Sequence, residues 1–436
     1  MPIVLGVPPT VLELQQKGLI ERAFHDGLFP NLAFRAEALA EEWPANTGTE
    51  VFMTRPGLLT PITSPIAAGS DPQPQQVVYE QWGATLEQYG GSIDTHMPTS
   101  VTANADLFLR NVHQLGLQAG QSINRIARNA MFKAYLSGQT TLLAATASGD
   151  TTIRVASLSG FTDVVAAGSN VRPLPVSPAS PLSIRIGNTS PTVRSVIGAI
   201  PDDSTDPTGP GTLVLSASVG SVIAIRSAVR SAYAPRVVRS AAGASVDAIS
   251  ATDTLTLQQC INAVAFLRNA NVQPHEDGFY HAHLSPLANA QFFADPVFQR
   301  LNQSLPEHVT YKEGFIGSIA GILFYMNTES PSALNSGTRK STGTSAYFSQ
   351  EIAAETTNNA GVDIGRVILT GKGCLYEKYL DESQYVTEAG TTGKIGEFDV
   401  VNSGVSVLTE RIRLVLRAPL DRLQQKVAAT WSISTS

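Results

Sequence analysis

Residues 102–138 read TANADLFLRNVHQLGLQAGQSINRIARNAMFKAYLSG and form the longest helical pattern in the chain. Apolar or small side chains recur there at steps of three and four, which places them on one helix face: Phe108, Val112, Leu115, Ala119, Ile123, Ile126, Ala130 and Ala134. The opposite face carries polar side chains, including Arg110, Arg125 and Arg128. At about 1.5 Å per residue this helix would be roughly 50 Å long, longer than a compact domain needs. Taken alone, the pattern predicts a core helix of a large globular protein.

The ends of this stretch fit a single helix, and its middle contains one weak point. Thr102 or Asn104 can cap the start, and Gly138 fits the end. Gly116 and Gly120 each destabilise a helix interior by about 1 kcal/mol relative to alanine. We therefore expect a bend or a closely packed neighbour at these glycines.

The composition is poor in charge and rich in turn-forming residues. The 436 residues are 43% hydrophobic and only 15% charged, with 35 glycines and 26 prolines. A chain of this length has room for two or three domains. A weakly charged surface is unusual for a freely soluble monomer and favours a protein buried in an assembly. The net charge of −6 argues against general nucleic-acid binding, which needs a basic face.

Cysteine usage and hydropathy point to a soluble protein made in a reducing cytosol. Cys260 and Cys374 are too few for a disulfide framework or a zinc site. The N-terminal residues lack the basic region and the long apolar run of a signal peptide. The longest apolar run, residues 316–326, is too short to cross a bilayer, so no membrane partner is expected.

The chain begins with weak helical patterns and then a proline-rich hairpin. A capping box at Thr10 opens one helix, and residues 32–43 predict a second, so residues 1–45 are interpreted as an arm. Strand patterns at 49–54 and 75–89 enclose a segment with prolines at 56, 61, 65, 72 and 74, which cannot donate ladder hydrogen bonds.

This pattern predicts a long hairpin with a stiff, wide tip and no core of its own. A free two-stranded ribbon is only marginally stable in water, so a neighbouring subunit could support it. An ordinary surface hairpin is the alternative. Residues 89–94 are expected to turn the chain into the long helix.

The composition changes after residue 138. No lysine and no glutamate occurs between Lys133 and Glu276. Short β-prone runs are separated by Gly, Pro and Ser: residues 151–158, 182–187, 192–200, 211–216 and 222–225. Regular short strands with such turns predict a small β-barrel or sandwich, inserted at about 140–235.

Mixed helical and strand patterns follow the insertion. Residues 253–269 predict a helix with Leu257, Ile261 and Val264 on one face. A strand at 278–284, a helix capped by Ser285 and opened by Pro286, a helix at 296–305, two strands within 313–326 and a polar loop at 327–346 come next. Strand patterns at 366–369, 374–379, 411–417 and 426–433 end the chain, the last two with alternating apolar positions.

No catalytic motif is present, so we expect neither an enzyme nor a cofactor. The nucleophile-elbow, phosphate-loop, dinucleotide and zinc-protease patterns are all missing from the sequence. The Gly371-Lys372-Gly373 run lacks the spacing of a phosphate loop. His281 and His283 share one strand face and could bind a metal, but a polar, partly buried strand face is the favoured interpretation.

The order of these elements resembles the major capsid proteins of tailed bacteriophages, which have the Hong-Kong-97 fold. Four stretches carry the resemblance: LFLRNVHQLGLQAGQSINRIARNAMFKAYLSG (107–138), GFYHAHLSPLANAQFFADPVFQRL (278–301), EGFIGSIAGILFYMNTESP (313–331) and TERIRLVLRAPLDRLQQKVAATWSI (409–433). The resemblance implies an α+β fold of this type. Its domains would be an N-terminal arm (1–45), an extended loop hairpin (46–100), a spine helix of the peripheral domain (101–138), an inserted β-rich barrel or sandwich (139–240), an axial domain (241–360) and a peripheral-domain sheet with a C-terminal strand (361–436).

The resemblance also implies a function. The chain would self-assemble, as hexamers and pentamers, into an icosahedral shell enclosing double-stranded DNA. It would be built in the bacterial cytoplasm and end in the virion, with scaffold, portal and decoration proteins as further partners and weak, non-specific contact with DNA. The alternatives are an encapsulin-like nanocompartment shell, and less favoured, a β-rich adhesin or hydrolase. Candidate subunit-interface residues are Arg55, Pro56, Pro61, Pro65, Glu80, Trp82, Arg110, Arg125 and Arg128.

Overall fold

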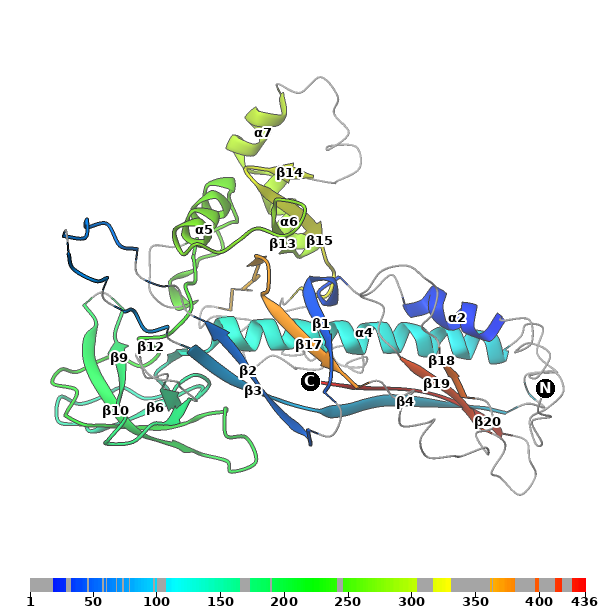
Figure 1. Ribbon diagram of the computed structural model, residues 1–436, viewed down its shortest axis with the longest axis horizontal. Coiled ribbons are helices and arrows are strands. Elements are labelled where there is room, and N and C mark those ends of the chain that lie inside the picture. Colours follow the sequence, from blue (N-terminus) through cyan, green and yellow to red (C-terminus); the bar gives the residue numbers. More distant parts are fainter. Residues whose placement is uncertain are drawn as a thin grey trace. The chain divides into compact units, whose positions relative to one another are not determined.

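The computed structural model describes residues 19–28, 33–44, 47–56, 59, 61–67, 69–72, 74–77, 79–96, 99, 107–164, 173–188, 190–240, 246–303, 317–330, 361–362, 364–380, 397–399, 412–417 and 426–436 (Figure 1). They divide into two compact units. The first spans Met1–Val51, Ala84–Met131 and Lys372–Ser436, and the second spans Phe52–Gly83 and Phe132–Gly371. Within the described residues, no helix is long and apolar enough to cross a membrane.

The first unit places the long helix on a mixed sheet. Its elements are α2 (Leu19–Leu28), η2 (Arg35–Glu37), β1 (Ala38–Glu42), β4 (Glu87–His96), most of α4 (Leu107–Leu136), β17 (Leu375–Tyr379), β18 (Glu397–Asp399), β19 (Arg413–Arg417) and β20 (Lys426–Thr435). The strand order is β1-β17-β20-β19-β18, and β4 also pairs with β20. Figure 1 shows α4 running alongside β4 and β20.

The core of this unit confirms the alternation predicted for the last strand. Val427, Ala429, Trp431 and Ile433 on β20 are all at most 2% exposed. They form one apolar cluster with the first half of α4 and with Phe24 of α2. Because side chains alternate between the faces of a strand, every second residue of β20 faces the helix.

The buried stripe of α4 departs from the predicted one in its second half. Phe108 to Ile123 are buried as expected, but Ala130 and Ala134 are exposed. Two adjacent rows of residues, each spaced by four positions, are buried in their place. The first row is Ala119, Ile123, Ala127 and Met131, and the second is Gly120, Asn124, Arg128 and Phe132. The backbone amide of Phe34 donates a hydrogen bond of 2.7 Å to Asn124 Oδ1, which is one cause of the changed burial. The segment around Phe34 therefore covers a helix face that the sequence assigns to solvent.

Residues 89–94 form part of a strand, so the predicted turn is wrong. β4 pairs antiparallel with β20 over ten positions, from Glu87↔Thr435 to His96↔Lys426. A Cβ on Gly90 would lie 2.8 Å from the Trp431 carbonyl oxygen, and one on Gly91 would lie 2.8 Å from Trp431 Nε1. The two glycines therefore permit close approach of β20 and its tryptophan, which explains glycine inside a strand.

The helix predicted at residues 32–43 is also wrong. Only Arg35–Glu37 is helical, and it forms a single 3-10 turn. Residues Ala38–Glu42 form β1, which pairs in parallel with β17 from Ala38↔Leu375 to Glu42↔Tyr379. Pairing with a strand more than 330 residues away outweighs local helix propensity here, as tertiary context commonly does.

The close neighbour expected at the helix glycines is found at Gly116. A Cβ on Gly116 would lie 2.3 Å from the Phe24 carbonyl oxygen, and one on Gly27 would lie 2.5 Å from the His113 carbonyl oxygen. Each helix thus contributes a glycine where α2 and α4 cross. The His113 ring bonds the Ala23 carbonyl oxygen at 3.1 Å and fixes the same crossing.

We predict that Gly116→Ala loosens this crossing. The added methyl group cannot be accommodated without moving backbone, and overpacking of this kind costs about 1–3 kcal/mol. Chemical denaturation of the full chain measures the free energy of unfolding. The control is Gln114→Ala, at an exposed position of the same helix, which should leave the stability unchanged or raise it slightly. Equal stability of the two variants would contradict the close contact.

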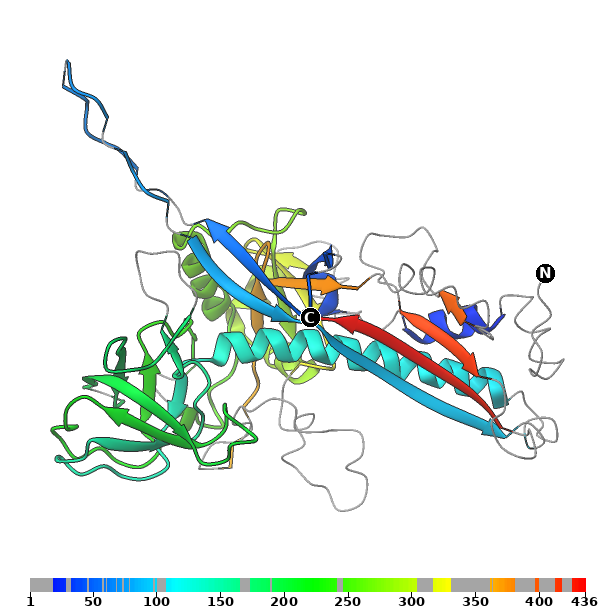
Figure 2. The ribbon, with the colours of Figure 1, turned by 60° about the horizontal axis from the view of Figure 1, so that its bottom comes forward.

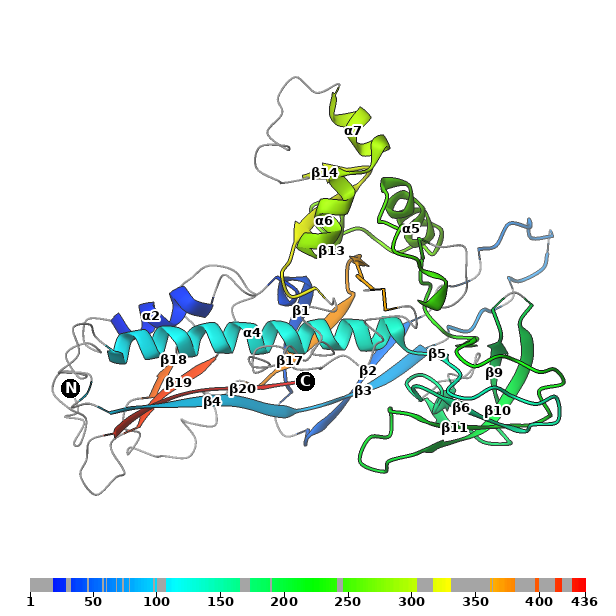
Figure 3. The same ribbon diagram turned by 180° about the vertical axis from the view of Figure 1, so that it is seen from behind.

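The second unit contains a six-stranded sheet between the end of α4 and residue 231. Its strands are β5 (Gln139–Thr141), β6 (Thr152–Val155), β9 (Leu182–Ile186), β10 (Thr192–Pro201), β11 (Gly211–Leu215) and β12 (Ala228–Ser231), in the order β5-β12-β9-β10-β11-β6. β7 (Asp163–Val164) and β8 (Leu174–Pro175) pair separately. An isolated bridge, Leu142↔Val155, and the bond from Ala156 N to the Thr141 carbonyl oxygen join the two edges of the sheet. Figure 3 shows the strands of this sheet from behind.

This sheet encloses a core of its own. The buried cluster contains fifteen apolar side chains, and all of them lie between Leu142 and Val229. The predicted strand at 222–225 is reduced to a single bridge between Ile223 and Thr146. A cluster closed within about 90 residues of one chain is what an independently folding domain requires.

We predict that residues 139–240 fold when expressed alone. A two-dimensional amide NMR spectrum of the fragment should be well dispersed. Ile184→Asp places a charge at a position that is 0% exposed, so the fragment should unfold and its amide signals should lose their dispersion. Ser183→Asp, at the exposed neighbouring position, should preserve it. A collapsed spectrum for the unmodified fragment would show that the sheet needs the rest of the chain.

The remainder of the second unit is an α/β layer. It comprises η3 (Val246–Ala248), α5 (Leu257–Asn269), β13 (Tyr280–Leu284), α6 (Pro286–Phe293), α7 (Pro296–Gln303), β14 (Ser318–Ile319), β15 (Ile322–Met326) and β16 (Ile368–Thr370). The strand order is β14-β15-β13-β16, with β13 parallel to β15. Phe292, Phe298 and Phe324 pack together in its core, with ring centroids 4.6–5.2 Å apart for the contacting pairs.

Most sequence predictions for this layer are confirmed. Ser285 Oγ accepts a hydrogen bond of 3.1 Å from Ala288 N, so the predicted cap is present. The glycine bend between two strands is found at Ala320 and Gly321, both with positive φ. Ile261 is 37% exposed, however, and Cys260 takes the core position expected for it. Of the predicted loop at 327–346, residues beyond 330 lie outside the described part of the chain.

Candidate subunit-interaction surface

The proline-rich hairpin pairs only with itself among the described strands. β2 (Glu50–Pro56) and β3 (Tyr79–Thr85) make a two-stranded sheet. Figure 2 shows the segment between them extending beyond the ends of both strands. Every described residue from 59 to 76 is exposed. Among the residues that the structure describes, this segment therefore contributes no side chain to a core.

The local contacts of the hairpin are few. Gln81 Nε2 donates to Thr54 Oγ1 at 3.2 Å, and the Phe52 ring lies against Gly83, where an added Cβ would be 3.3 Å from it. An aromatic ring over a cross-strand glycine covers backbone that would otherwise face water. These contacts join the two strands at the base of the hairpin.

Large apolar side chains are exposed along the hairpin. The exposed fractions are 44% for Phe52, 51% for Leu59, 65% for Ile62, 58% for Ile66 and 40% for Tyr79. Single exposed apolar residues are common on protein surfaces, but a concentration of them on one projecting element marks an interaction site. The hairpin is therefore the candidate surface for a partner subunit.

The nine candidate interface residues fall into different environments. Pro56, Pro61 and Pro65 are exposed on the hairpin, and Trp82 is half-buried. The side chains of Arg55 and Glu80 lie outside the described part of the structure. On α4, Arg110 is exposed, Arg125 is half-buried and Arg128 is only 2% exposed. Their role in an interface stays a prediction.

Arg128 requires a correction, because it is not on a solvated face. Eighteen residues separate Arg110 from Arg128, which is five turns of about 3.6 residues, so both point in the same direction from the helix axis. The Arg128 guanidinium instead bonds Asn129 Oδ1 through Nε at 3.0 Å and Nη2 at 2.9 Å. Helical period alone could not distinguish the two positions, because burial also depends on segments far away in the chain, such as the one that bonds Asn124.

A buried ion pair that the sequence did not indicate fixes the N-terminal segment to the first unit. Arg35 Nε and Nη2 lie 2.9 Å and 2.7 Å from the two carboxylate oxygens of Glu377. Thr435 Oγ1 donates to the same carboxylate at 2.9 Å. Burial lowers the pKa of Arg35, and the charge and hydrogen bonds of Glu377 oppose that shift. A separation of 342 residues explains why no sequence pattern shows the pair.

Loss of this pair should destabilise the first unit. Glu377→Gln leaves the Arg35 charge buried and uncompensated, which costs about 3–5 kcal/mol. Asp26→Asn is the matched control, because Asp26 pairs with Arg22 at 3.9 Å and both side chains are exposed, at 62% and 80%. An exposed pair of this kind contributes about 1 kcal/mol or less. Denaturant midpoints measure both, and similar losses for the two variants would contradict the assignment.

The two histidines considered as metal ligands have structural contacts. The His281 ring stacks on His275 with centroids 3.9 Å apart, and its Nε2 lies 2.8 Å from Asp277 Oδ2. His283 is 1% exposed and packs beside Tyr325, with centroids 5.7 Å apart. These rings belong to one face of the β13 sheet, as the favoured interpretation of the sequence expects.

Comparison with known proteins finds similarity in structure only. No protein-family model matches the sequence, and no curated protein matches it. The capsid of Ralstonia phage GP4 has a TM-score of 0.43 at 11% identity, covering 92% of this chain and 82% of that one. The capsid of cyanophage Pam1 has a TM-score of 0.44 at 10% identity, covering 90% and 80%. The capsid of cyanophage P-SCSP1u has a TM-score of 0.43 at 10% identity, covering 91% and 81%. These three solved structures are capsids of phages.

Proposed function

We propose that this chain is the major capsid protein of a tailed bacteriophage, with a Hong-Kong-97-type fold. In this role it self-assembles into an icosahedral shell that encloses double-stranded DNA. The single observation that carries the proposal is the hairpin, which is rich in prolines and whose described residues from 59 to 76 are all exposed, large apolar side chains among them.

The hairpin supports assembly through the hydrophobic effect. Burying one Leu, Ile or Phe side chain contributes about 1.5–3 kcal/mol, so the exposed apolar residues together offer several kcal/mol to a contact. The same residues are a liability in a monomer, because a two-stranded ribbon is marginally stable by itself. A neighbouring copy of the chain supplies the missing surface. Hexamers and pentamers repeat this contact around each local axis.

The first unit supports the proposal in a complementary way. A subunit in a shell must resist deformation while its projecting segments bind neighbours. The ten-position pairing of β4 with β20 and the packing of α4 on β20 give this unit a continuous core. In the proposed shell, residues 139–240 form a small inserted β-domain, and scaffold, portal and decoration proteins are the further partners.

The decisive test removes the tip of the hairpin. Deleting residues 56–74 should leave a cooperatively unfolding subunit and abolish or weaken shell formation, as seen by thermal unfolding and negative-stain microscopy. A finer variant, Ile62→Asp with Ile66→Asp, should have the same effect, because burying two carboxylates opposes the contact.

The matched control is Thr63→Asp with Ser64→Asp, which adds the same charge at exposed polar positions of the same segment. Its shells should form nearly as well as those of the unmodified chain. Loss of cooperative unfolding on deletion would place the hairpin in the subunit core, and shells that form equally in all variants would refute its role. Shells that hold protein cargo in place of DNA would favour the nanocompartment alternative.

A further inference from the structure

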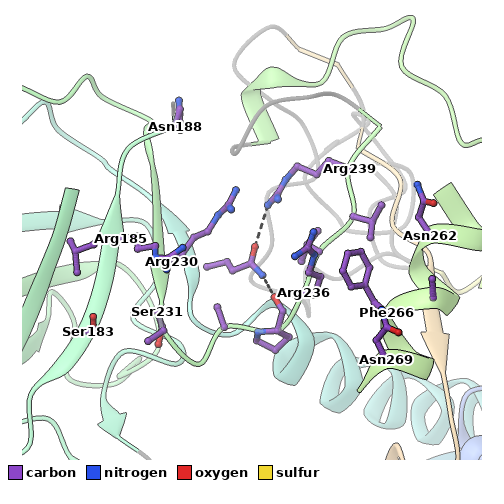
Figure 4. Close-up of a pocket in the computed structure, with 18 residues that line it drawn as sticks. Ser183, Arg185, Asn188, Arg230, Ser231, Arg236, Arg239, Asn262, Phe266 and Asn269 are labelled. Atoms are coloured by element: carbon purple, nitrogen blue, oxygen red, sulfur yellow. Dashed lines mark hydrogen bonds between the residues drawn. The ribbon is translucent and has the colours of Figure 1, made fainter. Parts of the chain in front are cut away.

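A cleft of about 980 Å³ in the second unit collects positive charge. It is lined by β9, β12, the segment that follows β12, and α5 (Figure 4). Four arginines contribute to its lining: Arg185, Arg230, Arg236 and Arg239. Among the described residues that line it, none is Asp or Glu. The chain as a whole has a net charge of −6, so this cleft has the opposite sign to the average surface.

The sheet register places two of these arginines directly opposite each other. Arg185 on β9 pairs with Arg230 on β12 in antiparallel register. Side chains at such positions have Cβ atoms about 4.5–5.5 Å apart, and like charges there destabilise the sheet. Val193, on the other neighbour of β9, offers Arg185 no opposing charge. An anion in the cleft would attract both guanidinium groups and so offset their mutual repulsion.

The other two arginines are held in place by contacts with the protein. The Arg236 guanidinium carbon lies 3.9 Å from the centre of the Phe266 ring on α5. Arg239 Nη2 donates to Gln139 Oε1 at 3.2 Å, and Gln139 Nε2 donates to the Pro235 carbonyl oxygen at 2.6 Å. Figure 4 shows this chain of bonds at the centre of the cleft. Groups fixed in this way lose little further freedom when a ligand binds.

Burial and repulsion between arginines both disfavour the charged forms of Arg230 and Arg239. Burial lowers the pKa of Arg239 to about 10, and repulsion from Arg230 adds to this shift. Burial also lowers the pKa of Arg230, and Arg236 contributes further. The cationic forms are therefore partly desolvated and close to one another. A negatively charged ligand would relieve both effects.

Neutral donors complete the lining. Asn188 accepts a hydrogen bond from Ala228 N at 2.9 Å through Oδ1, which directs its NH₂ group to other partners. Asn262 accepts from Gln258 Nε2 at 3.0 Å in the same way. With Ser183, these side chains give the cleft hydrogen-bond donors beside the guanidinium groups. A cleft rich in donors and lacking carboxylates is suited to oxyanions.

We propose that this cleft binds phosphate groups, either of a free polyphosphate or of a nucleic-acid backbone. Guanidinium groups bind phosphate oxygens through paired N–H···O bonds, and four of them match several negative charges spaced along one ligand. An acidic peptide is the less suitable ligand, because each carboxylate carries one charge and engages one guanidinium. The site does not depend on the proposed role in a shell.

The test measures binding to the full-length chain. The first probe is sodium tripolyphosphate, and isothermal titration calorimetry measures its binding. The second probe is a short fluorescein-labelled single-stranded DNA of mixed sequence, and fluorescence anisotropy measures its binding. Arg185→Gln and Arg239→Gln should each weaken binding by at least about tenfold, because each removes charge-assisted hydrogen bonds. Each should also lower the slope of log affinity against log salt by about one.

Arg154→Gln is the matched control, since Arg154 pairs with Asp202 on the same β-sheet and away from the cleft. It should leave binding within about twofold, because a single distant exposed charge is largely screened by salt. Thermal unfolding shows whether each variant is folded. If Arg239→Gln does not fold, the binding affinity of Arg185→Gln still tests the proposal, because Arg185 is exposed and its substitution should not disturb folding.

The two probes distinguish the sources of phosphate. Binding of both, lost in both cleft variants, supports a nucleic-acid backbone site, whereas binding of tripolyphosphate alone supports a site for free polyphosphate. No binding of either probe, equal loss in the Arg154→Gln control, or binding of a poly-glutamate peptide in preference to both would overturn the proposal.

Discussion

The packing of α4 on the β20 strand organises the first unit. Trp431 and its alternate neighbours on β20 meet the apolar stripe of α4, and β4 pairs with β20 along its whole length. β20 lies between β19, which directly precedes it in the chain, and β4, which lies more than 300 residues earlier. Such non-local contacts incur a large loop-closure entropy, so the apolar contact must be extensive. Gly90 and Gly116 are the local consequence, since each lets another backbone approach closely, and Gly91 leaves room for the Trp431 and Gln118 side chains.

The hairpin differs from the first unit, because the described residues of its tip are exposed and not packed in a core. It has strand propensity and apolar side chains, but it contains several prolines, and among the described strands β2 and β3 pair only with each other. A stable first unit and an unsupported hairpin belong together in a protein that assembles. In the proposed shell, the first unit would keep its shape while the hairpin would gain its stability from a second chain. This difference in stability within one chain is the physical basis of the proposed function.

Net charge describes a protein surface only on average. The chain is acidic overall, which argues against a general nucleic-acid-binding face. The same chain gathers four arginines in one cleft and excludes carboxylates from the described lining. Two of these arginines come from adjacent strands, and the other two come from the segment that follows them. A local site of this kind can bind an anion without raising the affinity of the rest of the surface, because salt screens exposed charges beyond about 8–10 Å.

The amino-acid sequence determined the elements whose signals are local. The long helix, the alternation in β20, the Ser285 cap and the strand-rich composition of residues 139–240 all follow from periodicity, capping chemistry or turn residues. Tertiary structure alone decided which elements meet. It made a strand of Ala38–Glu42, buried Arg128 while leaving Arg110 exposed, and joined Arg35 to Glu377. It also set Arg185 opposite Arg230. These outcomes depend on contacts between residues far apart in the chain, and no period or motif within a short window records such contacts.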